Sequence, residues 1–240
     1  ILNFAFMAFA DSRGAAFADI TYGFYPVYGE LHNVNAQIIP LEEDFSLDYR
    51  KYCGLDKMIV IANPNAPTGM EIPLWQIEEI LKTNPDSVVV IDEAYVDFGG
   101  TSCYKLIENY DNLLVVRTFS KSRCLAGARL GYAFGSPELI EDLEKLKYST
   151  NPYNVNRLTL LLGTATVDAE DYYTESYALG DEREAMLRVA LERAGKTDCR
   201  LLRHCPCGLS QLADCLRGNG AADSGYRQRR RSDRSCLYLY

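Results

Sequence analysis

The sequence lacks any apolar run approaching the ~20 residues that a membrane-spanning helix requires. It also lacks an excess of positive charge, because its formal net charge is −8, and this argues against nucleic acid as a partner. The N-terminus has no basic stretch of the kind that starts a secretory signal peptide. We therefore expect no membrane partner and no nucleic-acid partner, and we predict a cytoplasmic protein.

Cysteine pairs at the usual metal-binding spacing are missing as well. Five of the eight cysteines fall after residue 195, yet Cys205 and Cys207 are separated by a single residue. No second C-x-x-C pair accompanies them, as a structural zinc site would require. We predict no metal site, and we expect no disulfides in a reducing compartment.

Apolar residues are abundant enough for a core, since they make up 48% of 240 residues. Stretches typical of strands alternate with stretches of helical periodicity. This alternation predicts an α/β fold, a three-layer arrangement in which helices cover both faces of a mostly parallel sheet. The expected strands are 15–19, 36–40, 59–62, 88–91, 113–116 and 129–134, and the expected helices are 1–10, 74–83, 101–109, 137–147, 153–168 and 169–194.

Polar side chains follow three of the apolar strands. Asn63 ends the first, Asp92 ends a run of four β-branched residues, and Lys121 follows the third. In an open α/β sheet, ligands bind outside the carboxyl ends of the strands. We therefore expect these three side chains to converge on one ligand.

Lys121 lies among small and hydroxyl residues after a buried strand, where an amine is placed to form an imine with a carbonyl. Only the neutral amine does this, so the lysine needs desolvation or nearby cations. Arg117, Arg123 and Arg129 are candidate cations. The alternative is an ordinary surface lysine in a polar loop. An imine-forming lysine, a carboxylate and an amide together suit pyridoxal 5'-phosphate, because the carboxylate pairs with the ring nitrogen and the lysine holds the aldehyde.

At these residues the sequence resembles a known family, the pyridoxal-phosphate-dependent aminotransferases of fold type I, and within it the histidinol-phosphate aminotransferases. The resemblance covers roughly residues 1–195. Five segments in the same order carry it: Thr21 to Tyr25, Asn63-Pro64-Asn65-Ala66-Pro67-Thr68-Gly69, Asp92-Glu93-Ala94-Tyr95, Thr118-Phe119-Ser120-Lys121 with Leu125-Ala126-Gly127 and Arg129, and Pro152 to Asn156.

The resemblance implies a role for each matching residue. Catalysis would depend on Lys121, Asp92 and Tyr95, with Asp92 on the ring nitrogen. The cofactor would be held by Tyr22 stacked on its ring, by Asn63 and Tyr95 at its phenolic oxygen, and by Thr118, Ser120 and Arg129 at its phosphate. A guanidinium and hydroxyls are also standard phosphate ligands on chemical grounds.

Some residues near these motifs are left open. Asn154 is either a turn residue or a residue near substrate or cofactor, and Tyr22 has the alternative of an ordinary core or surface aromatic. Tyr25 and Tyr28 are expected to serve packing.

The family resemblance also implies substrates and partners. We expect transamination between L-histidinol phosphate and 2-oxoglutarate or glutamate, in histidine biosynthesis, by a homodimer. Two alternatives remain. One is another pyridoxal-phosphate enzyme, such as an aromatic aminotransferase or a threonine-phosphate decarboxylase. The other is a fragment without catalytic activity.

The chain changes character near residue 196. Residues 1–195 hold 16 basic and 29 acidic residues, whereas residues 196–240 hold 9 and 4. We predict a cofactor-binding large domain at 1–168 that is shortened at its N-terminus, a helix at 169–195, and a basic, cysteine-rich segment at 196–240. A shifted reading frame would explain that segment, which we expect to add no native domain, so that the small domain is largely missing.

Overall fold

The computed structural model describes residues 1–177 and 236–239. Residues 170–177 are helical, which agrees with the start of the helix expected at 169–194. The rest of that helix, and most of the basic segment, lie outside the described residues.

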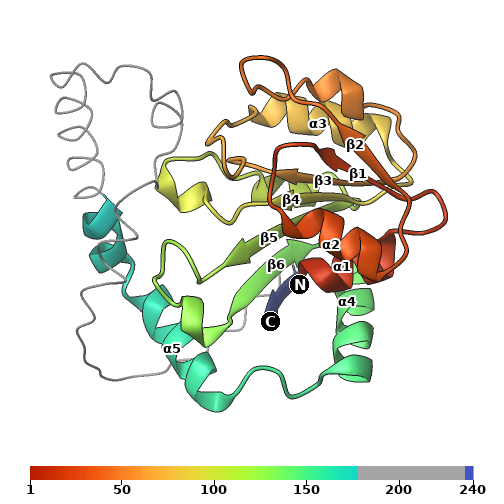
Figure 1. The fold of residues 1–240 in the computed structure, drawn as a ribbon. Helices are drawn as coiled ribbons and strands as arrows, with labels where there is room; N and C mark the ends of the chain where they lie inside the picture. Colours follow the sequence, from red (N-terminus) through yellow and green to blue (C-terminus); the bar gives the residue numbers. More distant parts are fainter. Residues whose placement is uncertain (178–235, 240) are drawn as a thin grey trace, which may run out of the picture.

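A single sheet of seven strands forms the centre of the fold (Figure 1). Its order is β2-β1-β3-β4-β5-β6-β7. Strands β1 to β5 are parallel, β6 is antiparallel to β5, and β7 is antiparallel to β6. The prediction of a mostly parallel sheet is therefore confirmed. The strands are β1 Ala15–Ala18, β2 Ala36–Ile39, β3 Met58–Ala62, β4 Val89–Asp92, β5 Leu113–Thr118, β6 Gly131–Gly135 and β7 Cys236–Leu239.

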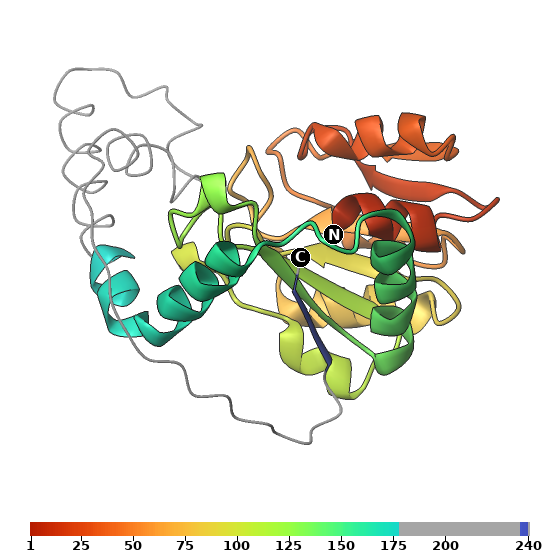
Figure 2. The same cartoon turned by 90° about the horizontal axis from the view of Figure 1, so that it is seen from below.

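Helical elements cover both faces of this sheet, as the two perpendicular views show (Figures 1 and 2). Helices α1 (Leu2–Phe9), α2 (Phe24–Leu31) and α4 (Pro137–Thr150) pack on one face. Helix α3 (Leu74–Thr83) packs on the other with the 3-10 segments η1 (Tyr49–Tyr52) and η3 (Tyr104–Glu108). The predicted three layers are thus present, and none of the described helices is long and apolar enough to cross a bilayer.

Period-two alternation divides each strand between two apolar cores. Val60, Val90 and Leu114 point into the core under α1, α2 and α4. Their chain neighbours Ile61 and Ile91 point into the core under α3. The faces that the strand-end side chains reach are fixed by this alternation, and this decides which of them can meet.

Three predicted elements have different boundaries or types. The helix expected at 101–109 is the shorter 3-10 segment η3, because the backbone amides of Thr101 and Cys103 donate to Glu71 and Glu93 and hold the preceding chain away from a helix. Helix α5 is Arg157–Asp168 and begins only after Asn156, whose side chain caps it by accepting from the backbone N–H of Thr159.

The strand expected at 129–134 begins instead at Gly131. Arg129 ends the 3-10 segment η4 (Ala126–Ala128) in a left-handed conformation, with φ 53°, that no strand contains.

The C-terminal end of the basic segment 196–240 contributes a strand to the sheet, and the prediction that this segment adds no native domain stays a prediction. Residues 236–239 form β7, which pairs with β6 in the register Tyr132↔Leu239 to Gly135↔Cys236. Because β6 would otherwise be an edge strand with unpaired backbone groups, it is a ready template for another extended segment.

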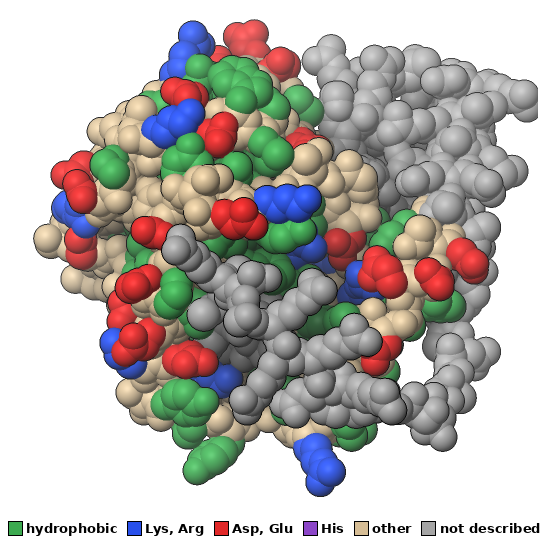
Figure 3. Space-filling view, turned by 180° about the vertical axis from the view of Figure 1, so that it is seen from behind, with side chains coloured by type: hydrophobic (Ala, Val, Ile, Leu, Met, Phe, Trp, Pro, Cys, Tyr) green, Lys and Arg blue, Asp and Glu red, His purple; other side chains and the backbone are tan. Residues whose placement is uncertain are grey.

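On the face seen in Figure 3, acidic and basic side chains lie interspersed among hydrophobic ones.

Candidate active site

Asp92 ends β4 and is 6% exposed. Its Oδ2 accepts a hydrogen bond from the Tyr25 hydroxyl at 2.8 Å, and its Oδ1 accepts one from the Ala94 backbone N–H at 3.1 Å. Burial raises the pKa of Asp92, and these two hydrogen bonds act in the opposite direction. Asp92 is thus a buried carboxylate that accepts hydrogen bonds from two neutral donors.

No Lys, Arg or His side chain in the described part of the chain forms a salt bridge with Asp92. The charge of the Ile1 α-amino group acts on Asp92 and lowers its pKa, although no ion pair joins the two among the described contacts. A buried carboxylate that lacks a cation in direct contact is costly unless a ligand supplies one. The pyridinium nitrogen of pyridoxal phosphate is a cation of the right kind, so the donor set around Asp92 fits this cofactor.

Lys121 follows β5 in a loop that several contacts fix. Its Nζ lies 5.0 Å from the centroid of the Tyr95 ring, a cation–π distance. The next residue, Ser122, is buried, and its hydroxyl donates to Oδ2 of Asp97 at 2.5 Å. Tyr95 and Asp97 are only two residues apart, so one short segment both contacts Lys121 and anchors its loop.

Two of the three neighbouring arginines are paired with carboxylates. Arg117 binds Glu93 at 2.8 Å, and Arg123 binds Glu170 at 2.7 Å. Both also lie within 4.0 Å of Asp97. Arg129 is different, because its guanidinium donates to a backbone carbonyl, that of Ala126, at 2.8 Å. Among these three arginines, Arg129 is therefore the one without a carboxylate partner in the described part of the chain, and its charge is available to a phosphate.

Tyr22 precedes α2 and connects these groups electrostatically. Partial burial raises its pKa first and the charge of Asp92 raises it further, while the charges of Lys121 and Arg129 lower it. The ring of Tyr22 also lies 5.5 Å from that of Tyr25, whose hydroxyl donates to Asp92. Direct contacts thus link Tyr22 to Asp92, and Tyr22 lies within electrostatic range of Lys121 and Arg129.

The residues predicted to bind phosphate lie at the turn from β5 to β6. The Oγ1 of Thr118 accepts from the backbone N–H of Ser120 at 3.1 Å and also lies 3.5 Å from the Leu130 carbonyl oxygen. Two hydroxyls and an exposed guanidinium thus come from one short connection. This set of donors fits a phosphate group.

Asn63 follows β3 at the same edge of the sheet, and its backbone N–H donates to the Asp92 carbonyl at 2.9 Å. Ala62 pairs with Asp92 in the sheet, so the two side chains lie on the same face. Asn63 is the next residue after Ala62, and by alternation its side chain points to the opposite face. There its amide donates to the Ile72 carbonyl at 3.2 Å and accepts from the Ile72 N–H at 2.9 Å. These two contacts close the turn after β3, and they use only one of the two protons on the amide nitrogen. The predicted contact of Asn63 with the cofactor stays a prediction.

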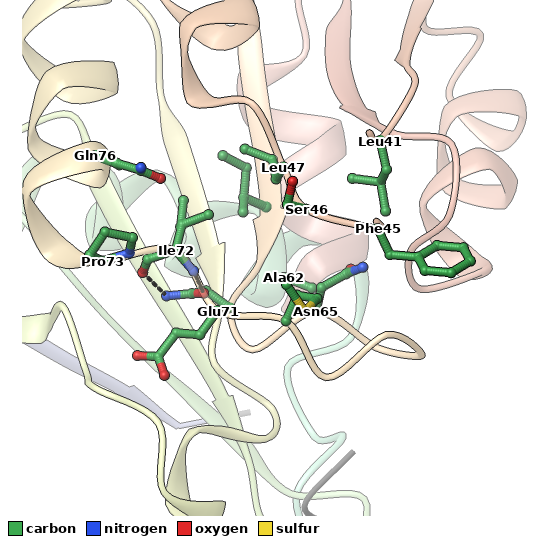
Figure 4. Close-up of a pocket in the computed structure, with 13 residues that line it drawn as sticks. Leu41, Phe45, Ser46, Leu47, Ala62, Asn65, Glu71, Ile72, Pro73 and Gln76 are labelled. Carbon is green, nitrogen blue, oxygen red and sulfur yellow. Dashed lines mark hydrogen bonds between the residues drawn. The ribbon is translucent and has the colours of Figure 1, made fainter. Parts of the chain in front are cut away.

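Asn63 lines a separate pocket of about 230 Å³ on that side (Figure 4). Residues from the loop after β2, the end of β3 and the start of α3 form its wall, and Asp92, Tyr22 and Lys121 do not contribute. The lining includes Leu41, Phe45, Ser46, Asn65, Ile72 and Gln76.

Two contacts of this region were not predicted. Tyr25 was expected to serve packing only, yet its hydroxyl binds Asp92. Glu93 was quoted as part of a motif and was given no role, yet its side chain is fully buried against Arg117. Strand alternation could have indicated that Glu93 needs a partner of its own, because Asp92 and Glu93 are adjacent acids that must face opposite sides. Asn154 remains open: its Oδ1 is buried and has no hydrogen-bond partner within the described residues.

Comparisons with known proteins agree with this arrangement. Residues 1–201 match the family "Aminotransferase class I and II". A histidinol-phosphate aminotransferase of Clostridium acetobutylicum is 51% identical over 177 residues, 73% of this chain and 50% of that protein. The chain thus spans about half the length of the curated relatives it matches.

Solved structures show the same fold. The crystal structure of the histidinol-phosphate aminotransferase from Clostridium acetobutylicum has a TM-score of 0.69 at 24% identity, covering 80% of this chain and 58% of that one. That of Sinorhizobium meliloti, in complex with pyridoxal-5'-phosphate, has a TM-score of 0.69 at 20% identity, covering 81% and 55%.

The layered, mostly parallel sheet is that of the large domain of fold type I aminotransferases. By its match over most of its length, the chain belongs to the aminotransferase class I and II family.

Proposed function

We propose that this protein is a pyridoxal-phosphate-dependent aminotransferase that acts on L-histidinol phosphate with 2-oxoglutarate as the amino acceptor. The observation that carries the proposal is Asp92, a buried carboxylate without a salt bridge in the described part of the chain. The Tyr25 hydroxyl links it to the ring of Tyr22, and Lys121 lies against Tyr95, three residues after Asp92. Histidinol-phosphate aminotransferases about half identical to this chain support the substrate.

When bound, the cofactor supplies an aldehyde for the substrate amine and an electron-withdrawing ring. Asp92 would accept a hydrogen bond from the ring nitrogen and favour its protonated form. The Nζ of Lys121 would hold the cofactor at its aldehyde and, when free, would serve as the base for the substrate Cα proton. Tyr95 lies beside this amine and keeps it near the reacting carbon.

The remaining residues orient the cofactor. Tyr22 would pack on the ring face, and Tyr95 and Asn63 would donate to the phenolic oxygen. Thr118, Ser120 and Arg129 would hold the phosphate. The amide nitrogen of Asn63 has a second proton besides the one that it donates to the Ile72 carbonyl.

Wider assignments rest on the family alone. We propose a homodimer in the cytoplasm, with residues 1–168 as the cofactor-binding domain and 169–195 leading toward a second domain. We also propose that residues 196–240 do not form that domain.

Borohydride trapping tests the proposal directly. The chain is incubated with pyridoxal phosphate, reduced, digested and analysed by mass spectrometry. We expect one adduct, on Lys121, which Lys121→Ala abolishes and the control Lys105→Ala leaves intact, because Lys105 is exposed on the opposite side of the sheet. An adduct on Lys57 or Lys105 in the wild-type chain would refute the assignment. A panel of histidinol phosphate, aromatic amino acids and threonine phosphate then separates the substrate alternatives.

A further inference from the structure

Tyr25 lies where α2 meets the sheet and is 0% exposed. Its hydroxyl donates to Asp92, which lies 67 residues away in the sequence. An ionised carboxylate can only accept hydrogen bonds, so the single phenolic proton must point at Asp92 whenever that group is charged. This contact therefore favours the ionised carboxylate over the neutral acid.

Aromatic neighbours on two sides fix the ring of Tyr25. It packs edge-on against Phe17 of β1, with centroids 5.9 Å apart, and edge-on against Tyr22 at 5.5 Å. Such contacts, together with complete burial, leave the ring one orientation. The same side chain thus touches both Asp92 and the aromatic residue proposed to cover the cofactor ring.

Tyr52 shows that burial alone does not explain the hydrogen bond of Tyr25. It is 1% exposed in the core on the other face of the sheet, and its hydroxyl has no hydrogen-bond partner in the described part of the chain. The two tyrosines are therefore alike in burial and differ in their contact with a carboxylate.

We infer that Tyr25 is a positioning residue for the proposed reaction, holding Asp92 as an ionised carboxylate opposite the cofactor's ring nitrogen and supporting Tyr22 against the ring face. Stabilising the anion keeps the shared proton on the ring nitrogen, where it makes the ring a better electron acceptor. This inference rests on the proposed function.

The test compares Tyr25→Phe with the matched control Tyr52→Phe, since each removes one buried hydroxyl. The full chain is loaded with pyridoxal phosphate labelled with nitrogen-15 at the ring nitrogen, whose chemical shift reports protonation without turnover. For Tyr25→Phe we expect a shift toward the neutral ring and an affinity for the cofactor that is about tenfold weaker. Tyr52→Phe should leave both unchanged.

A second comparison distinguishes positioning from general destabilisation. In an Asp92→Asn background, Tyr25→Phe should change the nitrogen-15 shift and the affinity no further, because Tyr25 acts through the carboxylate. Additive losses would mean that Tyr25 is only a packing residue.

If Tyr25→Phe does not fold, 3-fluorotyrosine placed at position 25 keeps the ring and makes the hydroxyl a stronger donor. The ring nitrogen should then be more fully protonated, and an unchanged shift would overturn the inference. A wild-type chain that binds no cofactor refutes the proposed function and this role with it. A wild-type chain that binds, with an unaffected Tyr25→Phe, refutes only the role of Tyr25.

Discussion

The carboxylate of Glu93 and the guanidinium of Arg117 form a buried ion pair at 2.8 Å, with the Glu93 side chain 0% and the Arg117 side chain 17% exposed. Glu93 also accepts from the Ser102 hydroxyl and the Cys103 backbone N–H, each at 2.7 Å. The pair joins β4, β5 and the loop before η3, directly behind the strand ends that carry Asp92 and Lys121. The pair therefore fixes β4 and β5 relative to each other on the face of the sheet opposite to Asp92.

Removing this pair should be costly. Glu93→Gln leaves the Arg117 charge without its main partner, and breaking a buried pair typically costs about 3–5 kcal/mol. We expect a loss near the lower value, because Arg117 is slightly exposed and also lies near Asp97. Urea unfolding of the chain measures it.

The control is Glu79→Gln, which breaks the exposed pair with Lys82 at 3.0 Å. Such pairs contribute about 0–1 kcal/mol. Equal losses in the two variants would show that the Glu93 pair does not anchor the fold.

Asp92 should make stability depend on pH with an unusual sign. Burial raises its pKa in the folded protein above the ordinary 3.8. A carboxyl with a raised folded-state pKa adds stability below the unfolded pKa, and this contribution is lost as the pH rises through the folded value. Asp92→Asn removes the titration. The cofactor-free wild-type chain should therefore lose stability relative to Asp92→Asn as the pH rises from about 4 toward neutral.

Asp48→Asn provides the opposite control for this pH series. The Arg50 hydrogen bond lowers the pKa of Asp48, so the contribution of Asp48 exists above the unfolded pKa and is lost on acidification. Thermal unfolding across the range measures both variants. The same trend in the two would contradict the burial argument for Asp92.

Deletion of residues 196–240 tests how far the sheet depends on its last strand. We expect the amides of β3, β4 and β5 to keep their protection from hydrogen exchange, because these strands and their two cores lie before residue 144. Amides of β6 should exchange faster, since β6 loses its pairing with β7 and becomes an edge. Loss of protection in β4 after the deletion would show that the C-terminal segment stabilises the whole domain.

Much of the fold could be predicted from sequence because the central strands are fully buried. Runs such as 88–91 and 113–116 have one reading in a parallel sheet, and the polar residue that ends each run is then placed at the carboxyl edge. Asp92 and Lys121 were located in this way. The boundaries of η3, β6 and α5 were missed because they depend on capping contacts and on one left-handed residue, Arg129, which local patterns do not reveal.

The contacts of Asn63 with Ile72 were not predicted. The position of a residue along a strand gives the edge of the sheet that it reaches, whereas its side-chain direction depends on strand register and parity. Counting from Ala62, which pairs with Asp92, gives the face on which Asn63 meets Ile72. The role of Tyr25 could not be found by any such count, because its contact joins segments that only the packing of α2 on the sheet brings together.

The adjacency of Asp92 and Glu93 has a consequence for how this chain tolerates change. The two consecutive acids lie on opposite faces of the sheet. Asp92 faces the proposed cofactor site, and Glu93 faces its buried ion pair with Arg117. Inserting or deleting a single residue within β4 would exchange them. Asp92 would meet Arg117, and the longer Glu93 would enter the cofactor side. Such a variant would conserve composition, charge and strand length almost completely, yet it would lose both the carboxylate of the proposed cofactor site and the Glu93–Arg117 ion pair.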